Sequence, residues 1–328
     1  MKLFLSKETS PYFNLSLEEL IATDSNFANE DVVFLYQHDN AVIIGKNQNA
    51  YEEIKRDYIK ENKIELSRRI SGGGAVYHDL GNVNFSFITN YNKDKTSYQR
   101  FLAPIIGYLN SLGLNAEFKG RNDLLCNGAK ISGNAQFIKG KRIVSHGTLL
   151  FDVDLTKLVN ALNPSKLKIQ SKGIQSVRQR VTNIAKELNY SLTVEEFISG
   201  LVKYFVEHHG AKYEEIDTRK YQPELDKLIS YRASEQWIYG TNPIFNVQNV
   251  IKYPNGILKV KLNIEHNKIK EIAFEGDFLS KKDLNDVIEL FKNIEYKKEA
   301  FAKVLDQIDL NLYFGGIEKE EILTLVFG

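Results

Sequence analysis

Residues 68–82 read Arg-Arg-Ile-Ser-Gly-Gly-Gly-Ala-Val-Tyr-His-Asp-Leu-Gly-Asn. Three consecutive glycines are unfavourable in a helix or a strand, because glycine loses the most conformational freedom on ordering. They let the backbone approach a ligand closely, and N–H groups beside the guanidinium of Arg69 suit an anion such as phosphate. A surface hairpin without a ligand is the alternative interpretation. The alternating strand predicted at residues 83–88 would anchor the loop to a sheet, which favours a binding loop.

Several motifs of other enzyme classes are absent from the sequence. There is no G-x-x-x-x-G-K-[ST] motif, which argues against a P-loop kinase or GTPase. The glycines lack the G-x-G-x-x-G spacing and open no predicted helix, which argues against a Rossmann site. The G-x-S-x-G motif of α/β-hydrolases does not occur either.

The composition limits the class of protein further. The chain has 328 residues, a formal net charge of +1 and 43% hydrophobic residues, which fits one large domain and a small one. The near-zero net charge gives no electrostatic reason to expect a nucleic-acid partner. A single cysteine, Cys126, excludes an internal disulfide and fits a reducing compartment. Because no apolar run suits a signal peptide or a membrane span, the sequence predicts a cytoplasmic protein without a membrane partner.

Helices and strands are both predicted over the first 240 residues. Helices are expected at residues 14–27, 52–61, 98–112 and from a capping box at 193–196 to Gly210. In the first of these, Glu18 and Glu19 are expected to face solvent. In the third, Pro104 predicts a kink or a later start. The apolar runs 32–36 and 41–45 are predicted to pair with each other as strands buried on both faces.

A second informative stretch covers residues 120–136, which are predicted to form a hairpin around a tight Asn127-Gly128 turn. Lys130 follows this turn and could reach a phosphoryl or carboxyl oxygen, although by itself it would more simply be a solvated lysine. Asp123, near a phosphate loop, is a candidate Mg²⁺ ligand, with a turn residue as the alternative.

A domain boundary is predicted near residues 239–246, where glycine, asparagine and proline occur together. We therefore predict a catalytic domain at residues 1–243 and an accessory domain at 244–328. The accessory domain is expected to be α+β. Its predicted elements are strands at 260–264 and 269–274, helices near 280–293 and 297–307, and a strand near 312–314.

Five motifs in order resemble those of the lipoate–protein ligase family, of the A type with a C-terminal accessory domain. They are residues 68–82, Gly-Arg-Asn-Asp at 120–123, Lys-Ile-Ser-Gly at 130–133, His-Gly-Thr-Leu-Leu at 146–150 and Lys-Gly-Ile-Gln-Ser-Val-Arg at 172–178. The resemblance covers nearly the whole chain. It implies an α+β fold whose catalytic domain has a mixed β-sheet of the biotin/lipoate ligase type.

The resemblance also implies a reaction in two steps. With Mg²⁺, ATP and (R)-lipoate form lipoyl-adenylate and pyrophosphate, with octanoate as an alternative acyl substrate. The lipoyl group then passes to a lysine ε-amine on an apo-carrier lipoyl domain, such as glycine cleavage H protein or an acyltransferase subunit of a 2-oxoacid dehydrogenase. Residues 166–183 would close over the adenylate and exclude water.

Site residues follow from the same resemblance. Lys130 is the expected catalytic residue, and Asp123 the expected Mg²⁺ ligand. ATP and the adenylate are expected to contact Arg69, Gly74, Ala75, Val76, Tyr77, Asn82, Lys130 and Ser132. Lipoate is expected to contact Arg69, Ser71, Gly72, Gly73, His78, Lys130 and His146. The apolar slot for its dithiolane tail is assigned to Val42, Ile44, Gly73 and Val76.

Two other functions are compatible with these motifs. One is an ATP-independent lipoyl or octanoyl amidotransferase, a class of the same superfold that uses a cysteine thioester elsewhere in the chain and generally lacks the accessory domain. Here we expect Cys126 to be a buried structural residue. The other is a non-catalytic carrier-protein binder or lipoate sensor. The presence of Arg69, Asp123 and Lys130 argues against this last function.

Overall fold

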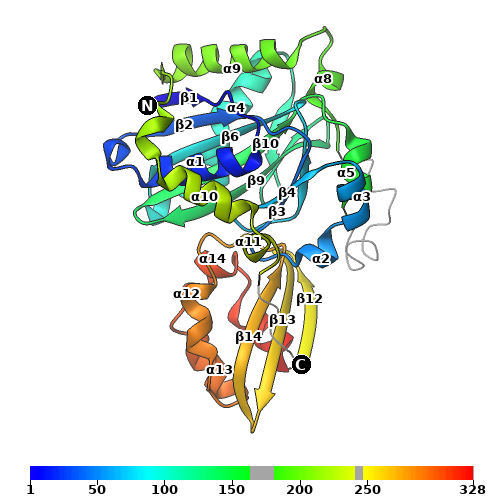
Figure 1. Cartoon of the computed structure of the whole chain (residues 1–328), viewed down its shortest axis with the longest axis vertical. Helices are drawn as coiled ribbons and strands as arrows, with labels where there is room; N and C mark the ends of the chain where they lie inside the picture. The colour runs from blue at the N-terminus through cyan, green and yellow to red at the C-terminus, as the bar shows by residue number, and fades with distance from the viewer. Residues whose placement is uncertain (163–180, 241–246, 328) are drawn as a thin grey trace.

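The computed structural model describes residues 1–162, 181–240 and 247–327 (Figure 1). A large N-terminal part lies above a smaller C-terminal part in this view. The predicted boundary between residues 243 and 244 lies outside the described residues, and so does most of the predicted closing loop at 166–183. None of the helices in the described ranges is both long and apolar enough to cross a membrane.

A mixed sheet of eight strands forms the centre of the large part. Its strand order is β11-β1-β2-β6-β10-β9-β8-β7. The strands are β1 (Lys2–Leu5), β2 (Val32–Tyr36), β6 (Asn82–Asn90), β7 (Ala116–Lys119), β8 (Asp123–Cys126), β9 (Ala129–Lys139), β10 (Arg142–Leu150) and β11 (Lys212–Tyr213). β1 runs parallel to β2 and β11, and the other neighbours are antiparallel. The mixed-sheet α+β prediction is therefore confirmed.

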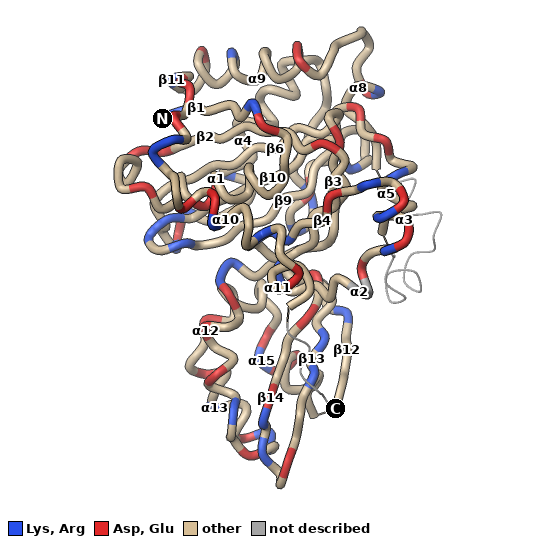
Figure 2. The backbone as a smooth tube through the Cα atoms, in the orientation of Figure 1, with Lys and Arg blue, Asp and Glu red and all other residues tan. Residues whose placement is uncertain are grey.

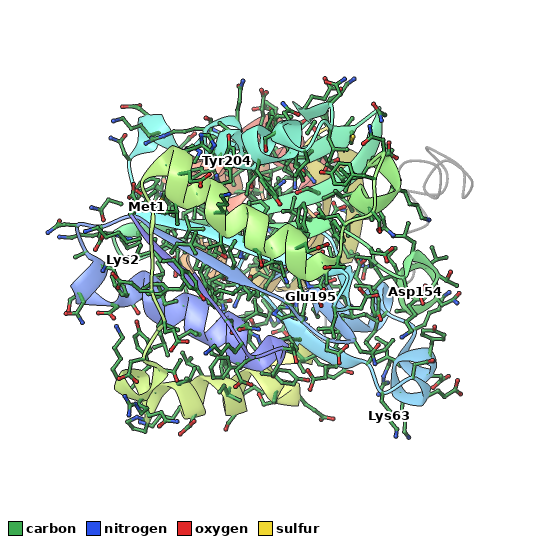
Figure 3. All side chains as sticks on the ribbon, turned by 90° about the horizontal axis from the view of Figure 1, so that it is seen from above. Met1, Lys2, Lys63, Asp154, Glu195 and Tyr204 are labelled. Carbon is green, nitrogen blue, oxygen red and sulfur yellow. The ribbon has the colours of Figure 1, made fainter. Side chains whose placement is uncertain are left out.

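Helices cover both faces of this sheet (Figures 1 and 3). On one face, α4 (Tyr98–Ser111) and α9 (Val194–His209) bury apolar side chains against the strands. On the other face, α1 (Pro11–Thr23) and α10 (Glu224–Ala233) do the same. Seen from above, the α9 helix with Glu195 lies across the strands from α1. Because apolar residues cover β2 on both faces, its sequence is a continuous apolar run.

A second, three-stranded sheet carries the glycine loop. β3 (Ala41–Ile44) lies between β4 (Glu65–Arg68), which is parallel to it, and β5 (Val76–His78), which is antiparallel. The predicted pairing of residues 32–36 with 41–45 is therefore wrong. Both strands are buried, but β2 pairs with β1 and β6 in the large sheet. The hydrophobic pattern predicts that a strand is buried, but it does not predict which other strand pairs with it.

Short helices complete the large part, and several differ from the predicted bounds. They are α2 (Ala50–Glu53), α3 (Arg56–Glu61), α5 (Leu155–Ala161), α8 (Ile184–Glu187) and α11 (Glu235–Tyr239), with 3₁₀ turns at Ser25–Phe27, Lys93–Lys95 and Thr218–Tyr221. The single helix predicted at 52–61 is interrupted where Ile54 forms a bridge with Leu162. The later start predicted from Pro104 is wrong, because the Ser97 hydroxyl accepts the N–H of Arg100 and caps a helix that begins at Tyr98.

Two local predictions from the sequence are confirmed. The Thr193 hydroxyl accepts the N–H of Glu196, whose carboxylate accepts the N–H of Thr193, and Gly210 closes this helix in a left-handed conformation. Asn127 and Gly128 both have positive φ at the turn between β8 and β9, as a tight hairpin turn requires.

The accessory part has its own sheet and its own core. β12 (Val247–Tyr253), β13 (Gly256–Glu265) and β14 (Lys268–Gly276) are antiparallel. The helices α12 (Asn285–Ile288), α13 (Lys298–Leu305), α14 (Leu310–Tyr313) and α15 (Lys319–Phe327), with a 3₁₀ turn at Glu289–Phe291, pack against the sheet. The strand predicted near 312–314 is wrong. Asp309 accepts the N–H of Asn311 and caps the short helix α14 instead.

The glycine loop lies at the junction of the two parts. The N–H of Gly72 donates to the carbonyl of Ser280 at 3.3 Å, and the N–H of Gly73 donates to the carbonyl of Phe278 at 3.2 Å. Asn47 Nδ2 donates to Ser280 Oγ at 2.8 Å. Basic and acidic residues are interspersed over both parts (Figure 2), in keeping with the small net charge.

Candidate active site

A cavity of about 860 Å³ lies between the glycine loop, the β8–β9 hairpin and the accessory part. Buried side chains on its wall include Leu15, Tyr36, His38, Ile43, His78, Asn84 and His146. Basic side chains on its wall are Arg69, Lys119, Arg121, Lys130 and Lys252. The cavity thus combines a buried, partly apolar region with cationic groups, an arrangement that suits an acyl chain attached to an anion.

Nine of the predicted site residues line this cavity. They are Arg69, Gly73, Gly74, Ala75, Val76, His78, Asp123, Lys130 and His146. Ser71, Gly72, Tyr77, Asn82 and Ser132 are absent from its wall. Tyr77 is fully buried and its hydroxyl donates to Asn40 Oδ1 at 3.1 Å, while Asn82 and Ser132 are bonded to other buried polar side chains.

Two of the four residues assigned to the apolar slot, Val42 and Ile44, are absent from the cavity wall. Val42 and Ile44 belong to a core cluster with Leu66 and Tyr77, whereas Ile43 lines the cavity. Successive side chains of a strand point to opposite faces. Val42 and Ile44 therefore cannot face the cavity when Ile43 does. Gly73 and Val76, the other members of the predicted slot, do line the cavity.

Arg69 holds the glycine loop in shape. Its guanidinium donates to the carbonyls of Gly72 and Gly74 at 2.8 Å each and to the carbonyl of Ile43 at 3.2 Å. Burial lowers the pKa of Arg69 to about 10, so the group remains charged at neutral pH. Gly73 has a φ of +94°, and an added Cβ would lie 2.8 Å from Arg69 Nη2. The loop therefore needs glycine at residue 73 both for conformation and for space.

Lys130 and Asp123 form an ion pair on the cavity wall. Lys130 Nζ lies 2.6 Å from Asp123 Oδ1, and each side chain is about one-third exposed. Lys130 Nζ also passes close to Gly133, where an added Cβ would lie 3.1 Å from it. The backbone carbonyl of Lys130 accepts the N–H of Thr182 at 3.0 Å, and Thr182 belongs to the described end of the predicted closing loop. Lys130 is therefore held between a carboxylate and a glycine, with its ammonium accessible from the cavity.

A buried chain of hydrogen bonds runs from Glu18 to the glycine loop. His146 Nδ1 lies 3.0 Å from Glu18 Oε1, and His146 Nε2 lies 2.6 Å from Ser71 Oγ. Arg69 Nε donates to Ser71 Oγ at 3.1 Å. Since a carboxylate accepts only, we assign the His146 proton to Nδ1, so that Nε2 accepts the proton of Ser71. This arrangement pairs each donor with an acceptor and links Glu18 to the conformation of the loop.

Glu18 is the main site residue that sequence reasoning missed. It was expected to face solvent, but its side chain is 2% exposed. Burial alone would raise the pKa of Glu18, but the opposing effects of His146, Ser86 and Arg232 lower it overall. Glu18 is therefore a buried carboxylate behind His146, which lines the cavity, and the outward orientation predicted for Glu18 is wrong. Glu19 instead pairs with Arg232 and Lys139.

Two histidines share one hydrogen bond on the buried part of the wall. His38 Nδ1 lies 3.1 Å from His78 Nδ1. Burial lowers the pKa of His38 to about 3 and lowers that of His78 well below its usual value. Both rings are therefore neutral at neutral pH, and one donates to the other. Only His78 was predicted from the sequence, because it lies within the 68–82 motif.

Cys126 lies apart from the cavity. Its side chain is fully buried in the core between the large sheet and its helices, and burial raises the pKa of its thiol. A thiol without access to the cavity and with a raised pKa is a poor nucleophile. This agrees with the structural role expected for Cys126.

Known protein families match the chain over both parts. Residues 10–206 match the model of the lipoyl protein ligase A/B catalytic domain, and residues 242–326 match that of the bacterial lipoate protein ligase C-terminus. The chain belongs to the lipoate–protein ligase family. It is 40% identical to lipoate-protein ligase LplJ of Bacillus subtilis over 321 residues, which are 97% of each chain.

Solved structures of the lipoate–protein ligase family share this fold. The crystal structure of P. falciparum LipL1 in complex with lipoate has a TM-score of 0.79 and 27% identity, and the match covers 94% of each chain. A crystal structure of lipoate-protein ligase A bound with ATP has a TM-score of 0.61 and 27% identity, with 73% of this chain and 98% of that chain covered. These relatives bind lipoate and ATP respectively.

Proposed function

We propose that this member of the lipoate–protein ligase family is an ATP-dependent enzyme that forms lipoyl-adenylate in the described cavity. The observation that carries the proposal is the position of Lys130 and the glycine loop on the wall of one cavity that also has a buried, partly apolar region. The buried region suits the acyl chain, and the cationic region suits the carboxylate and the phosphates. Similarity to relatives that bind lipoate and ATP supports both substrates.

Formation of the adenylate brings two negatively charged groups into contact. The lipoate carboxylate must attack the α-phosphate of ATP, and the two groups repel each other. In the proposed mechanism, the ammonium of Lys130 lies between them and offsets the charge that develops on the α-phosphate. Asp123 holds Lys130 in position before substrate binding. Arg69 keeps the glycine loop in the conformation that leaves room for the phosphate.

The family also implies Mg²⁺. Among the described residues, no group of three or more His, Cys, Asp or Glu side chains could hold a metal ion. This fits Mg²⁺, which commonly uses one or two carboxylates together with waters and substrate phosphates. Asp123 would supply the protein ligand in our proposal. When bound with ATP, Mg²⁺ would neutralise phosphate charge.

The proposed acceptor is a lysine on an apo-carrier lipoyl domain. Glycine cleavage H protein and the acyltransferase subunits of 2-oxoacid dehydrogenases are the carriers that the resemblance implies, and octanoate is an alternative acyl substrate. The requirement for ATP supports a cytoplasmic location. The position of Cys126 in the core disfavours an amidotransferase that would carry the acyl group on this cysteine.

The test is ATP–pyrophosphate exchange with and without lipoate. A ligase that forms an acyl-adenylate exchanges label from pyrophosphate into ATP when lipoate is present. An amidotransferase or a non-catalytic carrier binder does not. Absence of lipoate-dependent exchange in a folded preparation would therefore exclude the proposed activity.

A further inference from the structure

A second cavity lies at the seam between the two parts of the molecule. It has a volume of about 270 Å³, and we call it the seam cavity. The large part contributes Tyr91, Lys93, Thr96, Tyr98 and Arg121 to its wall. The accessory part contributes Leu279, Lys281, Asp309, Asn311, Leu312 and Gly315. Arg121 is shared with the candidate active site, so the two cavities are neighbours.

Backbone hydrogen bonds from both parts fix the wall of the seam cavity. The N–H of Ile138 in β9 donates to the carbonyl of Lys281 at 2.6 Å. The N–H of Lys281 donates to the carbonyl of Leu312 at 2.7 Å. Lys281 is therefore attached to the large sheet on one side and to the α14 segment on the other, and its backbone position is determined by the fold.

Positive charge is in excess around the seam cavity. Lys93 lies 3.8 Å from Asp309 and offsets its charge. Within the described part of the chain, Lys281 forms no ion pair, although Asp309 acts on it electrostatically. The side chain of Lys281 is half-buried, and this burial lowers its pKa. Arg121 adds a third cation, so the wall of the seam cavity has three cationic groups and one carboxylate, while the carboxylate of Asp277 lies near Arg121 outside this wall.

Two polar groups of the seam cavity are buried without a hydrogen-bond partner. They are the hydroxyl of Tyr98 and Nη1 of Arg121, as far as the described residues show. Arg121 Nη2 makes a long contact of 3.5 Å with the carbonyl of Asp277. Buried donors without acceptors are unfavourable, and in native proteins they usually have a partner. Among the described residues, Arg121 Nη1 and the Tyr98 hydroxyl are thus donors without an acceptor, beside an ammonium of Lys281 whose counter-charge is Asp309.

We propose that the seam cavity binds a small phosphate oxyanion between the two parts of the molecule. Such an anion accepts hydrogen bonds from several directions, so Arg121, Lys281 and Tyr98 could all donate to it. It would also offset the repulsion between Arg121 of the large part and Lys281 of the accessory part. Binding therefore stabilises the contact between the two parts. The anion could come from two sources, free inorganic phosphate or the pyrophosphate released by adenylation.

Calorimetric titration of the full chain with pyrophosphate, and separately with inorganic phosphate, tests this site. Lys281→Met keeps the apolar stem and removes the charge, and Tyr98→Phe removes only the hydroxyl. We expect each substitution to weaken anion binding by about tenfold or more, as loss of a charge-assisted contact does. Lys303→Met, which removes a charge from the exposed side of α13 in the same part, should leave binding unchanged.

The variant Lys130→Ala distinguishes anion binding in the seam cavity from anion binding in the active site. Because Lys130 is absent from the wall of the seam cavity, this variant should keep a pyrophosphate site that Lys281→Met loses. Tighter binding of pyrophosphate than of phosphate would identify the product as the source, and equal binding would indicate free phosphate. If neither anion binds, or if binding is lost in Lys130→Ala but kept in both Lys281→Met and Tyr98→Phe, the seam site is excluded. The second outcome would leave the proposed adenylation intact.

Discussion

Glu18 illustrates which site residues can be predicted from the sequence at the scale of single residues. Lys130, Asp123 and Arg69 lie in contiguous motifs, so a linear sequence reveals them. Glu18 lies on a helix, and charged residues on helices are usually exposed. The partner that retains it in the interior, His146, is 128 residues away in the chain. Contacts across that separation depend on the fold and leave no local signal in the sequence.

The first prediction concerns Glu18→Gln, which keeps the shape of the side chain and removes its charge. Loss of the charge-assisted bond to His146 should lower the free energy of unfolding by about 1–3 kcal/mol at neutral pH. The pKa of Glu18 is lowered in the folded state, so its stabilisation is present above the usual carboxyl pKa. It disappears as pH falls through the folded-state pKa. The urea-unfolding difference between wild type and variant should therefore shrink towards acid pH.

The dependence on pH distinguishes a charge effect from a packing effect. A difference that stays constant from neutral to acid pH would mean that packing, rather than the carboxylate, accounts for the loss. Glu195→Gln, which removes an exposed carboxylate from the first turn of α9, serves as the control.

The second prediction concerns Cys126→Ala. An acyl-adenylate route needs no thiol nucleophile, so lipoyl transfer to an apo-carrier should continue at nearly the wild-type rate. Because the residue is fully buried, a loss of stability of about 1 kcal/mol is expected from the small cavity. Mass spectrometry of the wild-type enzyme during turnover provides the second readout. Detection of a lipoyl thioester on Cys126 would contradict the prediction and favour an amidotransferase.

At the scale of elements, the sequence predicts most helices and strands but not how they combine. The apolar runs of β2 and β3 are recognisable, yet their partners belong to two different sheets. The periodicity of β3 also does not show which of its two faces lines the cavity. That face determines whether Val42 or Ile43 is on the cavity wall. The glycine stretch is recognisable as a loop, whereas its contact with Phe278 and Ser280 depends on residues that lie far later in the chain.

The third prediction tests this contact with Gly72→Ala. An added Cβ would lie 2.5 Å from the carbonyl oxygen of Phe278 and 2.7 Å from the N atom of Ser280. Both atoms belong to the backbone, so the accessory part has to shift, at a cost of about 1–3 kcal/mol. Hydrogen exchange of the Gly72 and Gly73 amides should become faster. In a chain ending at residue 240, which lacks both contacts, the substitution should have little effect on stability. An equal loss there would place the strain within the loop itself.

At the scale of the whole molecule, the fourth prediction is that a chain ending at residue 240 folds without its accessory part. The three clusters that bury the large sheet, the second sheet and their helices contain residues of the large part only. The accessory core consists of residues beyond 247. Circular dichroism and a cooperative thermal transition should show a folded protein, with lower activity because Lys252 and Tyr253 are removed from the cavity wall. Recovery of only insoluble protein would show that the two cores depend on each other.

The most direct test of the proposed function is pyrophosphate release from ATP and lipoate by Lys130→Ala. Loss of a contact that strengthens in the transition state costs about 3–4 kcal/mol, so the rate should fall by about a hundred-fold to a thousand-fold. Thermal melting should change little, because the side chain is partly exposed and pairs only at the cavity wall. Lys130→Arg should not restore activity, since a planar guanidinium does not replace a compact ammonium beside Gly133. A rate within a few-fold of wild type in Lys130→Ala, with the fold intact, would contradict the account.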